Sequence, residues 1–143
     1  DQEAAAAAGA DVVLLIVAML EDAQLRQLHE AAHQCGLETL IETHSLADIE
    51  RLLRLGITPD LLGINNRNIL VREVDDGDVS RTEDLRQHLP PAVPILSESS
   101  IRGPEDARRA RAAGADAILV GTSILQADDT SRTIDELIAV GWP

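Results

Sequence analysis

A chain of 143 residues with 45% hydrophobic content has the length and composition of one globular domain, and it is not typical of a disordered chain. Its formal net charge of −13 argues against a nucleic-acid partner, because acidic side chains repel phosphates. No apolar run approaches the roughly 18 residues that a membrane span requires, so we expect a soluble protein.

All 12 basic residues are arginine, against 25 acidic residues. Acid-rich sequence without lysine resembles proteins of salt-loving organisms with GC-rich genomes, and coding bias alone is the alternative. On the first interpretation, charge repulsion should destabilise the fold at low salt, and thermal melts at increasing salt would test this.

The chain begins at Asp1 without a charged and then apolar leader, so we expect a piece of a longer protein or a processed product. The single Cys35 cannot form an internal disulfide, which fits a reducing cytoplasm. Because Cys35 lies among small apolar residues, we also expect its thiol to be buried.

Short apolar runs alternate with helical patterns along the chain. Each run is continuous, as in a parallel sheet that is covered on both faces. The expected strands are Val12–Val17, Thr39–Thr43, Leu61–Ile64, Val93–Leu96 and Ala117–Val120. Helical patterns with their caps are expected at Leu25–Cys35 before Gly36, at Ser45–Leu55 before Gly56, from the capping pair Ser80 and Glu83, and between Pro104 and Gly114.

One segment repeats within the chain: Ala7–Val12 recurs as Ala112–Ala117, with the same order of helix end, glycine and strand start. Coincidence in an alanine-rich chain is possible, but one repeating αβ unit is the simpler explanation. The α/β pattern leaves two architectures, an open doubly wound sheet or part of a (β/α)8 barrel. No glycine-rich nucleotide-binding motif follows the first strand, which weakens the first. The acidic run Asp75–Asp78 predicts a solvated loop rather than a calcium site.

Polar residues stand at the expected strand ends, where a barrel carries its chemistry. Leu40 and Glu42 share a face by strand alternation, and an acid directed into a barrel mouth would lose hydration and gain the pKa of an acid–base catalyst. A solvated charge is the alternative. His44 is expected to be a loop or rim histidine, because no second His or Cys stands at metal-ligand spacing.

The stretch Gly63–Asn68 combines a glycine, amides and the cationic fork of Arg67. It suits a ligand site, although a polar turn closing the strand is the alternative. We expect Asn65 to lie near Glu42, and Arg67 to pair with an acidic substrate or with an acidic loop at the rim.

Two later strand ends carry hydroxyl groups and glycine: Ser97–Ile101 before Pro104, and Val120–Ser123. Paired loops after the last two strands are a common phosphate cradle in barrels. Capping of the following helices is the alternative.

Taken in order, these segments resemble indole-3-glycerol phosphate synthase. The resemblance covers nearly the whole chain and is carried by Leu14–Ile16, Leu40–Glu42, Gly63–Asn68, Ser97–Ser99 with Ile101, and Val120–Ser123. It implies a (β/α)8 TIM barrel of which residues 1–143 are the C-terminal part of a single catalytic domain, about its last five βα units. It also implies decarboxylating ring closure of 1-(2-carboxyphenylamino)-1-deoxyribulose 5-phosphate in tryptophan biosynthesis, with no cofactor or metal.

The resemblance also assigns roles. Glu42 would assist proton transfer, Asn65 would orient the reacting centre, and Ser99 would hold the substrate. Ser99, Ser100, Gly121 and Thr122 would surround the phosphate; Arg67 would line the same mouth, with Leu14 and Ile69 as its apolar wall.

Two departures from the family pattern stand out. Ser100 replaces the usual glycine and would be strained if its backbone were left-handed. The family's first three strands, with a glutamate and the lysine general acid, are missing, and arginine is a poor acid because its pKa exceeds about 12. We therefore expect the chain to be inactive alone and to pair with the missing N-terminal portion or with itself. The alternatives are a sugar-phosphate isomerase or aldolase and a degenerate phosphate-binding half-barrel without activity.

Overall fold

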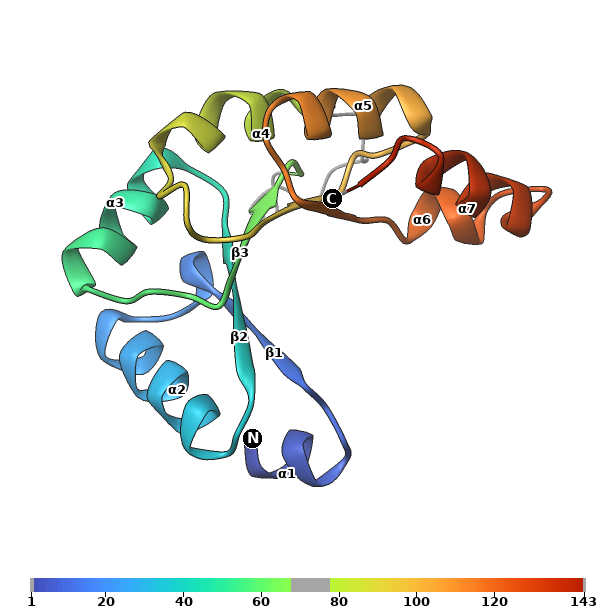
Figure 1. Ribbon diagram of the computed structural model, residues 1–143. Coiled ribbons are helices and arrows are strands. Elements are labelled where there is room, and N and C mark those ends of the chain that lie inside the picture. Colours follow the sequence, from blue (N-terminus) through green and yellow to red (C-terminus); the bar gives the residue numbers. More distant parts are fainter. Residues whose placement is uncertain (1, 68–77, 143) are drawn as a thin grey trace. The chain divides into compact units, whose positions relative to one another are not determined.

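Five strands alternate with helices in a computed structural model that describes residues 2–67 and 78–142 (Figure 1). Within these residues the strands form one sheet in the order β1-β2-β3-β4-β5. Strand β1 (Val12–Ile16) pairs in parallel with β2 (Glu38–Thr43), and β4 (Ile95–Glu98) pairs in parallel with β5 (Ala117–Leu119). The chain divides into two units, Asp1–Gly63 with Leu89–Pro94, and Ile64–His88 with Ile95–Pro143.

The first unit contains the first two strands, their helices and the start of the third strand. Besides β1 and β2, its elements are α1 (Gln2–Ala7), the 3-10 turn η1 (Val17–Met19), α2 (Asp22–Gln34), α3 (Leu46–Leu55) and the beginning of β3 (Leu61–Asn65). Helix α2 lies along β1 and β2 (Figure 1). The core of the first unit contains the aliphatic side chains of Leu25, Ile41 and Ile49, which are at most 1% exposed. Burial of each contributes about 1.5–3 kcal/mol.

The limits of α3 follow from its end residues. The Ser45 hydroxyl accepts a hydrogen bond from the Asp48 backbone N–H at 3.2 Å, which satisfies one donor of the first turn. Gly56 ends the helix with a left-handed φ of 66°. Both caps were expected from the sequence. Helix α2 has a capping box between Glu21 and Gln24 that the sequence analysis did not identify.

The second unit contains the rest of β3, both later strands and, among its described residues, four α-helices. Besides β4 and β5, its elements are α4 (Ser80–Leu85), the 3-10 turn η2 (Arg86–His88), α5 (Pro104–Ala112), α6 (Thr122–Leu125) and α7 (Thr130–Ile138). Helices α4 and α5 lie side by side (Figure 1). Ile64, Val79 and Ile95 fill the core with at most 1% exposure, and the fully buried Ala107 and Ala110 let α5 approach closely.

The internal repeat of the sequence is confirmed in the fold. Both copies end a helix, at Ala7 and at Ala112, and both precede a strand. The glycine of each copy has a left-handed φ, 86° at Gly9 and 94° at Gly114. Glycine adopts this conformation without the Cβ clash that strains other residues. The two helix–strand connections therefore have the same backbone conformation at their glycines.

Three expectations were wrong. Strand β4 begins at Ile95 rather than Val93, because Pro94 has no N–H to donate to a ladder. Ser80 does not cap α4: it is the first helical residue, and both its N–H and its hydroxyl donate to Asp78 Oδ1. Cys35 is half-buried rather than buried, because it lies at the C-cap of α2.

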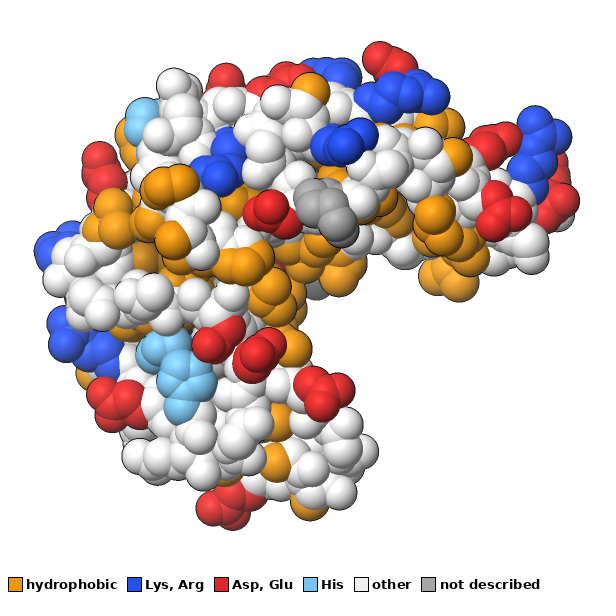
Figure 2. Space-filling model, viewed as in Figure 1, with side chains coloured by type: hydrophobic (Ala, Val, Ile, Leu, Met, Phe, Trp, Pro, Cys, Tyr) orange, Lys and Arg blue, Asp and Glu red, His pale blue; other side chains and the backbone are white. Residues whose placement is uncertain are grey.

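On the face seen in Figure 2, charged side chains are interspersed rather than gathered by sign. Figure 2 shows acidic residues at many separate points of the visible face, with arginines between them. This interspersion limits the local repulsion that a net charge of −13 creates. Among the helices described, none has the length and apolar character needed to cross a membrane.

Candidate functional site

A buried carboxylate and a buried imidazole meet at the end of β2 in the first unit. Glu42 is 4% exposed, so its carboxylate has lost most of its hydration, as expected. His44 Nε2 lies 3.1 Å from Glu42 Oε1. The His44 backbone N–H donates to Asp48 Oδ2 at 2.9 Å, which fixes the chain where it leaves the strand. The two side chains therefore form a close carboxylate–imidazole contact at the end of the strand.

His44 lies in the loop between β2 and α3, as the expectation of a loop or rim histidine allows, but its side chain is only 10% exposed and so does not lie at an open rim. It lies two residues beyond Glu42 and is the first residue after β2. That spacing was a sequence signal for a carboxylate–imidazole pair.

Leu14 lies on the same face of the first unit as Glu42. Leu14 is in register with Leu40, and Ile16 is in register with Glu42. Alternation along each strand puts these four side chains on one face. Leu14 is 50% exposed, and its role in an apolar wall, which the family resemblance implies, stays a prediction. Ile69, the other residue of the predicted apolar wall, lies outside the described residues.

In the second unit, Asn65 ends β3 and turns the chain. Its side chain is buried, and its Oδ1 accepts a hydrogen bond from the Arg67 backbone N–H at 3.0 Å. This Asx-type turn is the local preference that makes asparagine common at such positions. The stretch therefore turns the chain at Asn65, and its Arg67 lines a cavity, while the ligand site stays a prediction.

That cavity has a volume of about 180 Å³ and mixed chemistry. It brings together five of the predicted site residues with four neighbours: Arg67, Ser99, Ser100, Gly121 and Thr122, with Ile101, Leu119, Val120 and Ser123. The Ser123 hydroxyl donates to the Ile101 carbonyl at 2.6 Å and ties the two predicted loops together. A guanidinium beside hydroxyls and a glycine backbone is a suitable environment for an anion.

The loop after β4 carries backbone strain. Ser99 and Ser100 have φ angles of 64° and 58°, both in the left-handed region. For residues with a Cβ, this region costs roughly 1–2 kcal/mol each. The strain expected at Ser100 is thus present, and Ser99 shares it. Surrounding contacts must offset it for the turn to persist.

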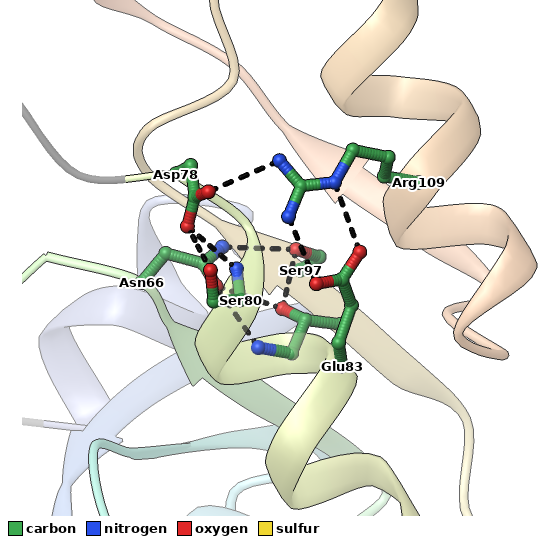
Figure 3. Close-up of polar contacts among 7 residues, drawn as sticks. Asn66, Asp78, Ser80, Glu83, Ser97 and Arg109 are labelled. Carbon is green, nitrogen blue, oxygen red and sulfur yellow. Dashed lines mark hydrogen bonds and ion pairs between the residues drawn. The ribbon is translucent and has the colours of Figure 1, made fainter.

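A buried hydrogen-bonded cluster holds this loop, and Figure 3 shows its members Asn66 and Ser97. Asn66 Nδ2 donates to Ser97 Oγ at 3.0 Å and to the carbonyls of Glu98 and Ser99 at 2.9 and 3.2 Å. Asn66 Oδ1 accepts from the N–H and the hydroxyl of Thr82 at 3.1 and 3.0 Å. The sequence analysis assigned no separate role to Asn66 or Thr82. The two consecutive asparagines were a sequence signal for two roles: the Asn65 amide turns the chain, and the Asn66 amide holds the loop after β4.

A charged cluster lies beside this one and joins α4 to α5 (Figure 3). Arg109 donates two hydrogen bonds to the Glu83 carboxylate, at 2.9 and 2.8 Å, and one to Asp78 Oδ2 at 3.1 Å. Hydrogen bonds from Ser80 and from Arg109 lower the pKa of Asp78 to about 2. The Glu83 and Asp78 carboxylates raise the pKa of Arg109. Asp78 and Arg109 are therefore both ionised at neutral pH.

Among the residues that the structure describes, no three His, Cys, Asp or Glu side chains are grouped so that they could hold a metal ion.

Comparison with known proteins identifies the family of this chain. A sequence model of indole-3-glycerol phosphate synthase matches residues 2–137. The chain belongs to this family. The indole-3-glycerol phosphate synthase of Shouchella clausii is 39% identical over 137 residues, and that of Azospirillum brasilense is 40% identical over 133 residues. These matches cover 96% and 93% of the chain but 52% and 49% of the two proteins. The chain thus spans about half the length of the curated indole-3-glycerol phosphate synthases it matches.

Solved structures agree on the fold. The 3-hexulose-6-phosphate synthase of Salmonella typhimurium superposes with a TM-score of 0.80 at 16% identity, over 97% of this chain and 65% of that one. Thiamine phosphate pyrophosphorylase of Pyrococcus furiosus gives 0.71 at 19% identity, over 98% and 63%. At such identities the likeness shows the fold alone. The expected class, part of a (β/α)8 barrel within the indole-3-glycerol phosphate synthase family, is confirmed.

Proposed function

We propose that this chain is the C-terminal part of a single (β/α)8 catalytic domain, a carboxy-lyase that closes the indole ring in tryptophan biosynthesis. The substrate would be 1-(2-carboxyphenylamino)-1-deoxyribulose 5-phosphate, and the reaction would release carbon dioxide and water. The observation that carries the proposal is the cavity where Arg67 meets the hydroxyl groups of Ser99 and Thr122 in a chain of this family. A cytoplasmic location is part of the proposal, since a biosynthetic family and a single cysteine both favour it.

The cavity of the second unit would take the phosphate. Its backbone and hydroxyl donors at Ser99, Ser100, Gly121 and Thr122 suit phosphate oxygens, and Arg67 supplies the positive charge. In an otherwise acidic chain, such a local cation would decide where an anion can approach. Asn65, anchored through its Oδ1 to the Arg67 N–H, would orient the reacting centre beside the phosphate.

The Glu42–His44 pair of the first unit would handle protons. A buried carboxylate can accept a proton during ring closure, and an imidazole 3.1 Å away can share it. Leu14 would contribute apolar surface for the aromatic ring, with Ile69. Convergence of Glu42 on Asn65 and Ser99 at a common pocket stays a prediction of the barrel assignment.

The general acid would come from outside these residues. The chain has no lysine, and the pKa of arginine exceeds about 12, so its arginines are poor proton donors at neutral pH and cannot replace the family's lysine acid. The relatives are about twice as long. We therefore assign the acid to a preceding half-barrel, either covalently attached or paired.

Binding tests the anion site directly. Calorimetry with inorganic phosphate and with indole-3-glycerol phosphate should show binding of both, tighter for the indole compound. Arg67→Gln should weaken both by about tenfold, because a charge-assisted hydrogen bond is lost. Arg108→Gln is the matched control, since Arg108 is 61% exposed and pairs only with Glu105 among the ion pairs described.

Each result separates the alternatives. Equal affinity for plain phosphate and the indole compound would favour another phosphate-handling barrel or a degenerate half-barrel. No binding of either would contradict the anion site. Ring closure, followed by indole fluorescence, should require the N-terminal half of a relative, and full turnover by the 143-residue chain alone would overturn the assignment of the acid.

The proposed salt requirement rests on composition. An excess of 25 acidic over 12 basic residues should make the melting temperature rise from low to molar salt as repulsion is screened. A melting temperature independent of salt would leave coding bias as the explanation.

A further inference from the structure

We propose that Asn66 is a positioning residue that holds Ser99 and Ser100 in their left-handed conformation and so shapes the anion cavity. The inference deepens the proposed function and rests on it for the identity of the ligand. It depends on three observations in the second unit: what the Asn66 side chain binds, what fixes that side chain, and where the bound loop lies.

Asn66 hydrogen-bonds to the loop after β4 through both its side chain and its main chain. The Asn66 backbone N–H donates to the Glu98 carbonyl at 2.8 Å, and Nδ2 donates to the same carbonyl at 2.9 Å and to that of Ser99 at 3.2 Å. In a trans peptide the N–H points opposite to the C=O. Fixing these two carbonyls therefore fixes the direction of the Ser99 and Ser100 N–H groups.

A closed ring of hydrogen bonds fixes the Asn66 amide itself (Figure 3). Thr82 N–H donates to Asn66 Oδ1, which identifies the oxygen of the amide. The Thr82 hydroxyl then donates to Asn66 Oδ1, the Ser97 hydroxyl donates to Thr82 Oγ1 at 2.7 Å, and Asn66 Nδ2 donates to Ser97 Oγ. Each hydroxyl gives one proton and accepts one, so the ring is satisfied without competition.

Burial makes this ring rigid. Thr82 and Ser97 are fully buried, and Asn66 is 6% exposed. With little water to compete, each hydrogen bond is stronger and a broken one is costly. The loop that the ring holds is the one whose Ser99 and Ser100 line the cavity with Arg67. A left-handed pair of serines would otherwise relax to a common backbone conformation.

The decisive variant is Asn66→Asp. A carboxylate has the same shape and can still accept from Thr82, but it cannot donate to Ser97, Glu98 and Ser99. Ser45→Ala is the matched control, because it removes a helix cap in the first unit and leaves the ring intact. Thr82→Val is the second variant, which keeps the Asn66 donors but removes the hydroxyl that links the ring.

Two measurements on the full 143-residue chain decide the matter. In solution NMR, a strong intraresidue HN–Hα NOE at Ser99 and Ser100 reports positive φ, and a titration with inorganic phosphate gives the Kd. Asn66→Asp should lose the NOE signature and weaken phosphate by about tenfold, with Thr82→Val between it and the parent. Ser45→Ala should change neither.

The proposal is overturned if folded Asn66→Asp keeps both NOE signatures and binds phosphate within about twofold of the parent. If Asn66→Asp fails to fold, the proposal is overturned when Thr82→Val keeps both NOE signatures and the phosphate affinity of the parent. If the parent binds no phosphate, the anion site fails, and the NOE comparison alone still decides whether Asn66 holds the loop.

Discussion

Each unit of this protein contains a polar side chain whose hydrogen bonds link two strands, and we call each such link a tie. The two ties differ in the charge of that side chain and in its place along the strands. In the first unit, Asp60 precedes β3 and its Oδ2 accepts from the N–H and hydroxyl of Thr39, at the start of β2, at 2.8 and 3.0 Å. In the second unit, Asn66 follows β3 and donates to the end of β4. In barrels the starts of strands serve stability and their ends serve chemistry. The comparison suggests that position along the strand decides which purpose a tie serves.

Charge makes the first tie sensitive to pH. Partial burial raises the pKa of Asp60, but hydrogen bonds from His33 and Thr39 outweigh it and lower the pKa to about 2. His33 Nε2 lies 2.8 Å from Asp60 Oδ2, and His29 Nδ1 lies 3.1 Å from Thr39 Oγ1. The Asn66 ring has no titratable member. The first tie should therefore weaken in acid, and the second should not.

Removing the acid should give the largest effect on stability. Asp60→Ala leaves the Thr39 N–H and hydroxyl without their acceptor at a fully buried residue, which should lower the free energy of unfolding by about 2–3 kcal/mol. Urea unfolding followed by circular dichroism measures this. Phosphate affinity should stay the same, because the first tie serves stability. A weakened affinity would break the comparison.

Acid unfolding should sharpen the contrast. The folded-state pKa of Asp60 is about 2, below the unfolded value of about 3.9, so its contribution is complete above about pH 4 and is lost as pH falls toward 2. Asp60→Asn should show a smaller loss of stability than the parent over this window. Asp78, whose pKa is also about 2, contributes to both curves in this window. Parallel curves for parent and variant would contradict the assignment.

The charged cluster beside the Asn66 ring should matter least. Arg109 is 33% exposed and its partners Asp78 and Glu83 are 43% and 39% exposed, so water and salt screen the pairs. Arg109→Gln should lower the free energy of unfolding only slightly, and the loss should shrink at high salt. Arg132→Gln, which removes an exposed pair with Glu136, is the control. A loss that persists at molar salt would mean that packing of the arginine stem dominates.

Sequence patterns were sufficient where local physics decides. The glycines at 9, 56 and 114, the cap at Ser45 and Pro104 at the start of α5 follow from backbone preferences that need no distant partner. Strand β4 was placed two residues early because Ser97 and Glu98 are polar, and polar residues suggest a loop. They belong to the strand because neighbouring elements surround them, and Ser97 is fully buried.

The candidate site likewise contains residues that the sequence predicted and contacts that it did not. Arg67, Ser99, Ser100, Gly121 and Thr122 were each expected at strand ends, and the structure brings them to one cavity. The pairing of His44 with Glu42 and the ring of Asn66, Thr82 and Ser97 were not expected. A ring of this kind joins residues up to 31 positions apart, and no periodicity encodes such a match.

The amino-acid order alone determined the alternation of strands and helices, the turns that close each unit and the family, because these depend on short-range sterics, hydrophobic spacing and contiguous motifs. Only the tertiary structure decided which polar side chains meet, how deeply they are buried and that Ser99 and Ser100 adopt a left-handed backbone. Those properties depend on side chains from separate strands and helices sharing one dry volume, where hydrogen bonds must be completed by whatever neighbour the fold supplies.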